Sequence, residues 1–150
     1  MSAPTVSVRT QVRDLFLQAL LNLKNWPTVR EPSFDVSPKY LEAGECKTFP
    51  TYCVVATDER IESQTLEHMS CTLTLLVVIY AKDDTDPRAR LDAALEDAYE
   101  ALLGVKARQP DTMWKLDLED VTTDEGARSS HPYAQAQLRW SVRHRRRTAV

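Results

Sequence analysis

The chain has 150 residues, of which 43% are apolar, 27% charged and 7% aromatic, and its formal net charge is −3. This length suits a single domain over residues 1–150, and the composition excludes a disordered or fibrous chain. The longest uncharged apolar run, Leu73 to Ala81, is much shorter than the roughly 20 residues that cross a bilayer, so we expect no membrane span. No basic segment leads into an apolar one near Met1, which argues against secretion.

Charge is distributed unevenly along the chain. Residues 82–126 hold 6 basic and 13 acidic side chains, whereas residues 127–150 hold 6 arginines and no acid. Such a chain offers complementary surfaces to copies of itself, and its basic end also suits nucleic acid. Charge alone leaves both interpretations open.

The first expected element is a helix over residues 5–23, where apolar side chains recur at spacings of three and four. Pro27 should end it, because proline disfavours helical geometry in the residue before it. The stretch from Pro27 to Pro50 is rich in proline, which favours loop or edge structure with one short strand near residues 29–36.

Two strands are expected next, over residues 51–57 and 71–81, because both stretches are rich in β-branched and aromatic side chains. The second is expected at the centre of the sheet. The polar residues 58–70 between them are too many for a tight turn, so they are predicted to form a loop that projects from two antiparallel strands. A projecting loop is a suitable place for a partner to bind.

A second helix is predicted from Pro87 to Leu103, with Asp86 as its N-cap and Gly104 as its terminating residue. Residues 114–121 and 133–144 alternate apolar with polar side chains, which predicts strands with one face in water. This order of elements predicts an α+β fold, a mainly antiparallel sheet of about four strands with two helices packed on one face.

Motifs for catalysis are weak. The chain has only three glycines, Gly44, Gly104 and Gly126, so no glycine-rich loop can hold a phosphate. No serine lies in a nucleophile elbow. We therefore expect a protein that is not an enzyme and that uses no cofactor.

One group of side chains has the composition of a metal site: Cys46, Cys53, His68 and Cys71. It lacks the short paired spacings of zinc sites, so buried thiols beside a surface histidine are the simpler interpretation. Glu45-Cys46-Lys47 and Pro110-Asp111 have forms found in metal-dependent nucleases, but they occur in reverse order. The prediction is that the chain has no metal site.

The most concentrated charge is a set of arginines in a basic tail at about residues 143–150: Arg143, Arg145, Arg146 and Arg147. These side chains could contact phosphates. Trp140, however, shares its face with Leu138 and Val142, so it is expected in the core and not stacked on bases. Pairing of the arginines with acids of a neighbouring subunit is the preferred interpretation.

Three stretches of the sequence together resemble a known family. They are the amphipathic segment Val12–Leu20, the strand Leu73–Ala81 that leads through Asp83–Pro87 into a helix, and the ending Pro132–Val142. In these patterns the chain is similar to tail terminator proteins of long-tailed bacteriophages, the lambda minor tail protein U type. In that family small α+β subunits form a hexameric ring that caps the finished tail tube, stops its polymerisation and joins the tail to the head.

The resemblance covers most of the chain. It implies a virion protein of the tail–neck junction, assembled in the host cytoplasm, that acts by binding and without catalysis. The implied partners are copies of the same chain in a ring, the tail tube protein and a head-completion or neck protein. DNA would pass through the lumen without sequence-specific binding, and no membrane is involved.

Residues for these contacts can be named. The candidate tube-facing loop contains Asp58, Glu59, Arg60 and Glu62. The candidate acidic lumen contains Asp117, Glu119 and Asp120, because acidic walls would let DNA pass without holding its phosphates. The candidate subunit or neck contact is the arginine set of the basic tail.

Two other functions stay open. A head-completion or connector protein of the neck could share the size and the ring habit. A small nucleic-acid-binding or nuclease domain belongs to a different class, and the basic tail keeps it under consideration.

Overall fold

The computed structural model describes residues 7–108, 114–124 and 133–147. Its main elements are α1 (Val8–Leu21), β1 (Asp35–Ser37), β2 (Thr51–Gln64), β3 (His68–Lys82), α2 (Pro87–Arg108), β4 (Trp114–Asp124) and β5 (Tyr133–Arg147), with short 3-10 helices at Asn22–Asn25 and Ala43–Glu45. In the described chain no helix is both long enough and apolar enough to span a membrane.

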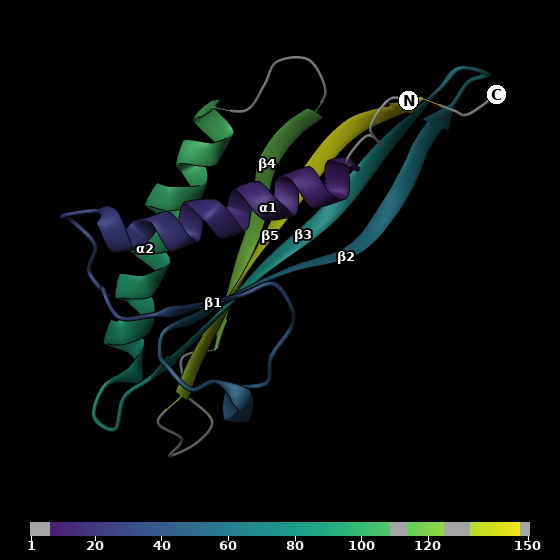
Figure 1. Ribbon diagram of the computed structural model, residues 1–150. Helices are drawn as coiled ribbons and strands as arrows, with labels where there is room; N and C mark the ends of the chain where they lie inside the picture. Colours follow the sequence, from purple (N-terminus) through teal and green to yellow (C-terminus); the bar gives the residue numbers. More distant parts are fainter. Residues whose placement is uncertain (1–6, 109–113, 125–132, 148–150) are drawn as a thin grey trace.

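The strands form one mixed sheet in the order β1-β2-β3-β5-β4, and both helices pack on one of its faces (Figure 1). β1 runs parallel to β2, and all other neighbours are antiparallel. The α+β class and the central place of the third strand are confirmed. The sheet has five strands in the described residues, slightly more than expected.

The core lies between the two helices and the sheet face beneath them. Alternate residues of β3 and β5 point into it and are fully buried, as their period of two predicted: Leu73, Leu75, Val77, Ile79, Ala136, Leu138, Trp140 and Val142. The ring of Phe16 from α1 meets the ring of Trp140 edge-on, with 5.3 Å between the ring centroids. Trp140 is therefore a core residue, as the sequence indicated.

The second helix is longer than predicted. It continues past Leu103 to Arg108, and Val105 is buried on the face that packs on the sheet. Burial of the valine side chain offsets the roughly 1 kcal/mol that Gly104 costs inside a helix. The start of the helix is as predicted, because the carboxylate of Asp86 accepts a hydrogen bond of 3.1 Å from its first turn.

Residues 58–70, predicted as a loop, are mostly strand. β2 continues to Gln64 and β3 begins at His68, so only residues 65–67 form the turn of a long hairpin with two irregularities in its register. Residues 57–70 are here called the hairpin arm. A projecting element is present, but its backbone is paired, because polar side chains suit a ribbon whose two faces meet water.

The basic segment that was predicted as a tail from residue 143 is also strand. β5 pairs with β3 along its whole length, to the pair formed by Arg147 and His68 at the base of the turn. Residues 148–150 lie outside the described residues. The arm is therefore supported by a third strand, and the charged stretch is held in a regular register.

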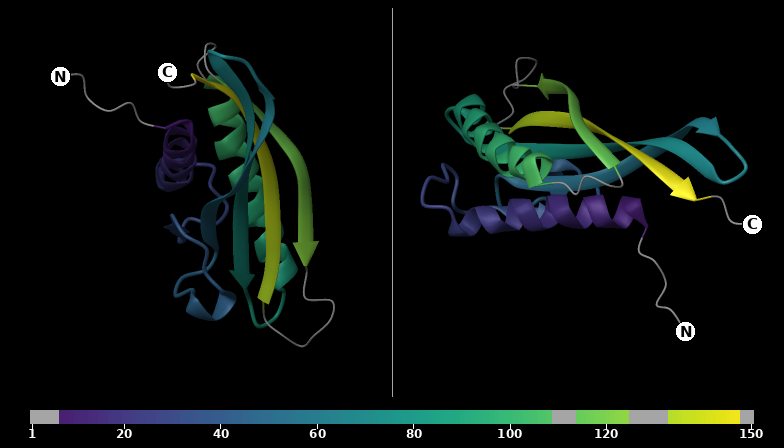
Figure 2. Two further views of the ribbon diagram at one scale, coloured as in Figure 1. Left: turned by 90° about the vertical axis from the view of Figure 1, so that its right-hand side faces the viewer. Right: turned by 90° about the horizontal axis from the view of Figure 1, so that it is seen from above.

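The sheet face away from the helices, here called the outer face, is covered at one end. Cys53, Val78 and Tyr80 point to this face and are buried by residues 38–50, with Leu41 among the contacts. Two views at right angles show this segment beside the sheet, with the arm extending from the opposite end (Figure 2). Toward the arm, no described residue covers the outer face.

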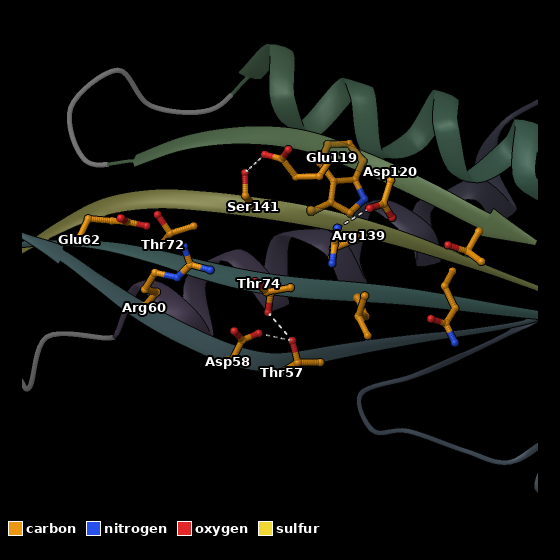
Figure 3. Close-up of a pocket in the computed structure, with 14 residues that line it drawn as sticks. Thr57, Asp58, Arg60, Glu62, Thr72, Thr74, Glu119, Asp120, Arg139 and Ser141 are labelled. Atoms are coloured by element: carbon orange, nitrogen blue, oxygen red, sulfur yellow. Dashed lines mark hydrogen bonds and ion pairs between the residues drawn. The ribbon is translucent and has the colours of Figure 1, made fainter.

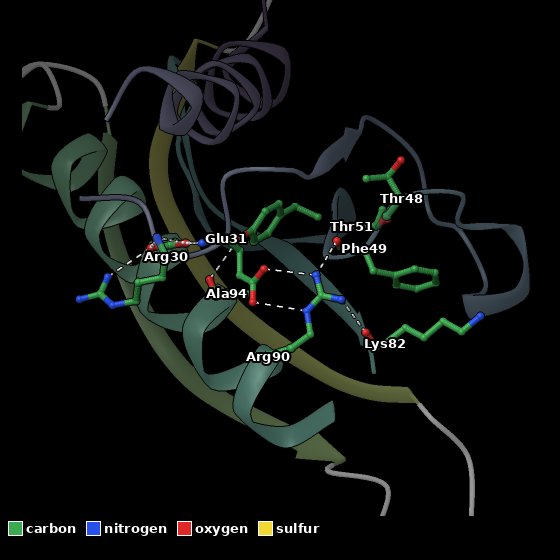
Figure 4. Close-up of polar contacts among 10 residues, drawn as sticks. Arg30, Glu31, Thr48, Phe49, Thr51, Lys82, Arg90 and Ala94 are labelled. Carbon is green, nitrogen blue, oxygen red and sulfur yellow. Dashed lines mark hydrogen bonds and ion pairs between the residues drawn. The ribbon is translucent and has the colours of Figure 1, made fainter. Parts of the chain in front are cut away.

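The proline-rich segment is held in place by α2 (Figure 4). Arg90 donates hydrogen bonds to the carbonyl oxygens of Lys82 and Phe49, at 2.8 and 2.9 Å, and forms an ion pair of 3.2 Å with Glu31. Asp97 of the same helix is fully buried and accepts hydrogen bonds from two backbone N–H groups of the segment, both at 3.0 Å. The segment is thus fixed to α2 by one fully buried carboxylate and by the part-buried contacts of Arg90.

Candidate interaction surface

Members of each of the three groups of predicted contact residues lie on the outer face beside the hairpin arm. The strand register runs across β2, β3, β5 and β4, so that Arg60 faces Thr72, Thr72 faces Arg143, and Arg143 faces Lys115. Side chains of paired residues lie on the same side of a sheet. Contacts that the sequence assigned to separate elements therefore share one surface.

This surface contains a shallow hollow of about 670 Å³ in the described residues (Figure 3). The residues that line this hollow are mainly polar or charged, and together they are here called the outer surface: Thr57, Asp58, Arg60, Glu62, Thr72, Thr74, Leu76, Glu119, Asp120, Thr122, Gln137, Arg139, Trp140 and Ser141. A broad polar hollow of this kind suits a macromolecular partner better than a small apolar ligand.

Glu59 departs from its predicted group. Its neighbours Asp58 and Arg60 line the outer surface, whereas Glu59 points to the helix-facing side. There its carboxylate lies 3.5 Å from the guanidinium of Arg9 and 2.9 Å from the ring of His144. The alternation of a strand, unrecognised in a segment taken for a loop, explains the difference.

The outer face has a basic end near the arm and an acidic middle. Lys115, Arg143 and Arg145 are exposed and lie in the part of the sheet that leads to the turn. Glu119 and Asp120 follow farther along β4. Acids of β4 and arginines of β5 are therefore adjacent on one face, an arrangement that can complement a shifted copy of itself.

The candidate lumen acids all have partners within the chain. Asp120 forms an ion pair with Arg139, and Glu119 accepts a hydrogen bond from the hydroxyl of Ser141. Asp117 lies 3.2 Å from the ammonium of Lys106 and 3.9 Å from that of Lys115. These cations weaken the negative potential that the three carboxylates would otherwise create.

The sheet has two different edges. β4 forms one of them. At the other, β1 pairs with Thr51–Cys53 only, so residues 54–64 of β2 form an edge in the part of the chain that the structure describes. Edge strands are templates for pairing with another chain unless something covers them.

The arm carries exposed apolar side chains, one of them at its tip. Leu66 in the turn is 94% exposed, and Ile61 of β2 is also exposed. Of this segment, only charged residues were predicted to make contacts. The apolar pair was a usable signal, because large apolar side chains in an otherwise polar projection favour a contact with a partner.

The shifted pKa values in the chain have local causes. Burial raises the pKa of the Cys46 and Cys53 thiols, which keeps them protonated and poorly nucleophilic at neutral pH. Backbone N–H groups at the start of α2, first that of Asp86, donate hydrogen bonds to Asp83 and lower the pKa of its carboxyl. These shifts have structural causes and give no indication of catalysis.

The structure does not assemble the metal-like group considered from the sequence. Cys46 belongs to the segment that covers the outer face, Cys53 lies beneath that segment, and His68 lies at the end of the arm. Cys71 points to the helix-facing side, where its neighbours are Glu59 and His144. Of the nuclease-like residues, Glu45 and Lys47 lie in the covering segment, and Asp111 lies outside the described residues.

No model of a protein family and no curated protein sequence matches this chain.

Proposed function

We propose that this chain is a tail terminator subunit of a long-tailed bacteriophage, one copy of a hexameric ring that caps the tail tube and joins it to the neck. The sequence resemblance supports the proposal, as does an α+β domain with both helices on one face. The observation that carries the proposal is the outer surface together with the arm. This charged sheet face is not covered, and the arm beside it ends in an exposed leucine, whereas both helices cover the other face.

Ring formation follows from the two sheet edges. The edge formed by β4 and the edge formed by residues 54–64 of β2 are different surfaces, so a contact between them joins one copy to the next head to tail. Contacts of this type repeat around a circle and close it when the rotation allows. Closure covers both of these edges in every subunit, which reduces the tendency of edge strands to aggregate.

The hairpin arm is the proposed contact with the tail tube. The ring would occupy the growing end of the tube and cover the interface to which another tube ring adds. Termination is then steric competition, in which no covalent bond is made or broken. The exposed Leu66 and the charged residues Asp58, Arg60 and Glu62 are the proposed contact residues.

The other two residue groups keep their proposed roles on the same face. Asp117, Glu119 and Asp120 would line the passage for DNA, with a weak negative potential because of their internal partners. The arginines of β5 would contact the next subunit or the neck protein. The proposed location is the virion, at the tail–neck junction.

Electron microscopy of the purified protein tests the proposal directly. We expect negatively stained rings with a central opening. A monomer that retards DNA in gels, with retardation lost as salt is raised, would overturn the proposal and favour nucleic-acid binding.

Particles of the parent phage produced without this protein separate the terminator from a neck connector. We expect tails of uncontrolled length, because nothing would stop polymerisation of the tube. Tails of normal length that lack heads would contradict the terminator role and assign the chain to the connector.

The basic end of β5 provides a sharper test of subunit contact. The double variant Arg143→Glu and Arg145→Glu is expected to weaken ring assembly at least tenfold, because both side chains are exposed and their reversal replaces attraction by repulsion. Assembly is measured by analytical ultracentrifugation at physiological salt. The matched control is Lys39→Glu with Lys47→Glu, which makes the same change of charge on the covering segment. Equal assembly of both variants would remove the arginines from the interface.

A further inference from the structure

The helix-facing side of the arm carries a cluster that the proposed function does not use. Glu59 of β2, Cys71 of β3 and His144 of β5 lie on adjacent strands, and one potential ligand atom from each lies within 4.8 Å of the other two. Cys71 and His144 are buried, and Glu59 is partly buried. The cluster combines a thiol, an imidazole and a carboxylate at the place where the arm joins the body of the domain.

One ring nitrogen of His144 has no hydrogen-bond partner among the described residues. The side chain of His144 is 3% exposed, its Nε2 lies 2.9 Å from Glu59, and its Nδ1 is buried with no hydrogen-bond partner among the described residues. A buried polar atom without a partner is unfavourable and uncommon in native proteins. Nε2 of the ring lies against Glu59, and the buried Nδ1 has hydrogen-bonding capacity that no described residue uses.

We propose that Glu59, Cys71 and His144 bind a divalent transition metal ion, zinc in particular. Sulfur, nitrogen and oxygen donors of these types are the usual zinc ligands, whereas magnesium and calcium prefer oxygen donors alone. Donor atoms around tetrahedral zinc lie roughly 3.3–3.8 Å apart, given bonds of about 2.0–2.3 Å. Side-chain movements of about 1 Å or less would bring the three donors to this geometry, and the fourth position would hold water.

Metal binding releases one proton from Cys71 and competes with the ion pair between Arg9 and Glu59. The Cys71 thiol loses its proton to solvent as the sulfur–metal bond forms. The other oxygen of the Glu59 carboxylate lies 3.5 Å from the guanidinium of Arg9. The positive guanidinium repels a metal cation, so the Arg9 side chain must turn away from Glu59 when the ion binds. The Arg9 side chain is 44% exposed, so it can turn into solvent at little cost.

The bound ion would connect three neighbouring strands through their side chains. Because Glu59 and Cys71 belong to the two strands of the arm and His144 to the strand beside it, the ion would stiffen the arm against the body of the domain. The site lies within a single chain, so its test does not depend on ring assembly.

Cobalt titration of the full-length protein, followed by competition with zinc, tests the site. In a phosphine reductant, which leaves metals uncomplexed by added thiols, we expect one equivalent of Co²⁺ to produce a near-ultraviolet sulfur-to-cobalt charge-transfer band that zinc abolishes. Cys71→Ser should remove the band, and Cys53→Ser, which changes another buried strand cysteine, should keep it. A band that is absent from the wild type, or that persists in Cys71→Ser, would overturn the proposal.

A second pair of variants tests the site even if Cys71→Ser does not fold. Glu59→Gln is expected to weaken zinc binding at least tenfold, whereas Arg9→Gln is expected to tighten it, because the competing cation is gone. Both are read by calorimetric titration. Zinc should also raise the Tm of the wild type by about 5 °C or more at a hundredfold excess over its Kd, and the same zinc concentration should raise that of Glu59→Gln by no more than about half as much. Equal affinities of Arg9→Gln and Glu59→Gln would contradict the assigned ligand.

Discussion

Replacing Asp97 by alanine is expected to lower the free energy of unfolding by about 3 kcal/mol. The carboxylate is fully buried and accepts hydrogen bonds of 3.0 Å from the backbone N–H groups of Arg30 and Glu31. It also lies 3.2 Å from the guanidinium of Arg30. Its removal leaves two N–H groups without an acceptor and opens a space under the segment that α2 holds in place.

Urea unfolding followed by circular dichroism, at one protein concentration, measures this loss. The matched control is Arg30→Ala, which removes the cation but keeps the backbone N–H that Asp97 binds. Because the Arg30 side chain is 42% exposed, its ion pair is screened by solvent and its loss should have a much smaller effect. Equal destabilisation by the two variants would show that the ion pair, and not the backbone contacts, fixes the segment.

Replacing Leu66 by aspartate is expected to abolish tube capping while leaving the fold intact. The side chain is 94% exposed in the turn of the hairpin arm, so its change should alter the free energy of unfolding by about 0.5 kcal/mol or less. A charge at the proposed contact with the tube would have to be buried without a partner, which opposes docking. This prediction rests on the proposed function and separates the role of the arm from that of the ring.

The measurement is tail length in particles of the parent phage that carry the variant, together with ring formation by the purified protein. We expect normal rings and tails of uncontrolled length. Leu103→Asp is the control, since this leucine is 49% exposed on α2, away from the arm. Tails of normal length with Leu66→Asp would show that the arm tip does not contact the tube.

The elements that periodicity predicted are those with one buried face. Residues 133–144 alternate so regularly that their strand and the burial of Trp140 followed from the sequence. The amphipathic spacing predicted α1, and Asp86 was correctly predicted as the N-cap of α2. In each case the pattern records the side of the element that must avoid water.

The predictions were wrong at two places, the hairpin arm and the end of α2, where tertiary contacts outweigh the local preference of the sequence. The arm has little buried surface of its own, so its residues lack the alternation that reveals a strand, and pairing with β5 stabilises it. Gly104 is a plausible helix terminus in isolation, but burial of Val105 favours another turn. Neither contact is visible in a short window of sequence.

By itself, the sequence determined the class of fold, the positions of most helices and strands, and the existence of separate acidic and basic stretches. Only the tertiary structure decided which charged groups share a face and that Glu59 meets His144, 85 residues farther along the chain. The physical reason is that strand register sets which side chains are neighbours. A register depends on the packing of the whole sheet, whereas periodicity depends on each segment alone.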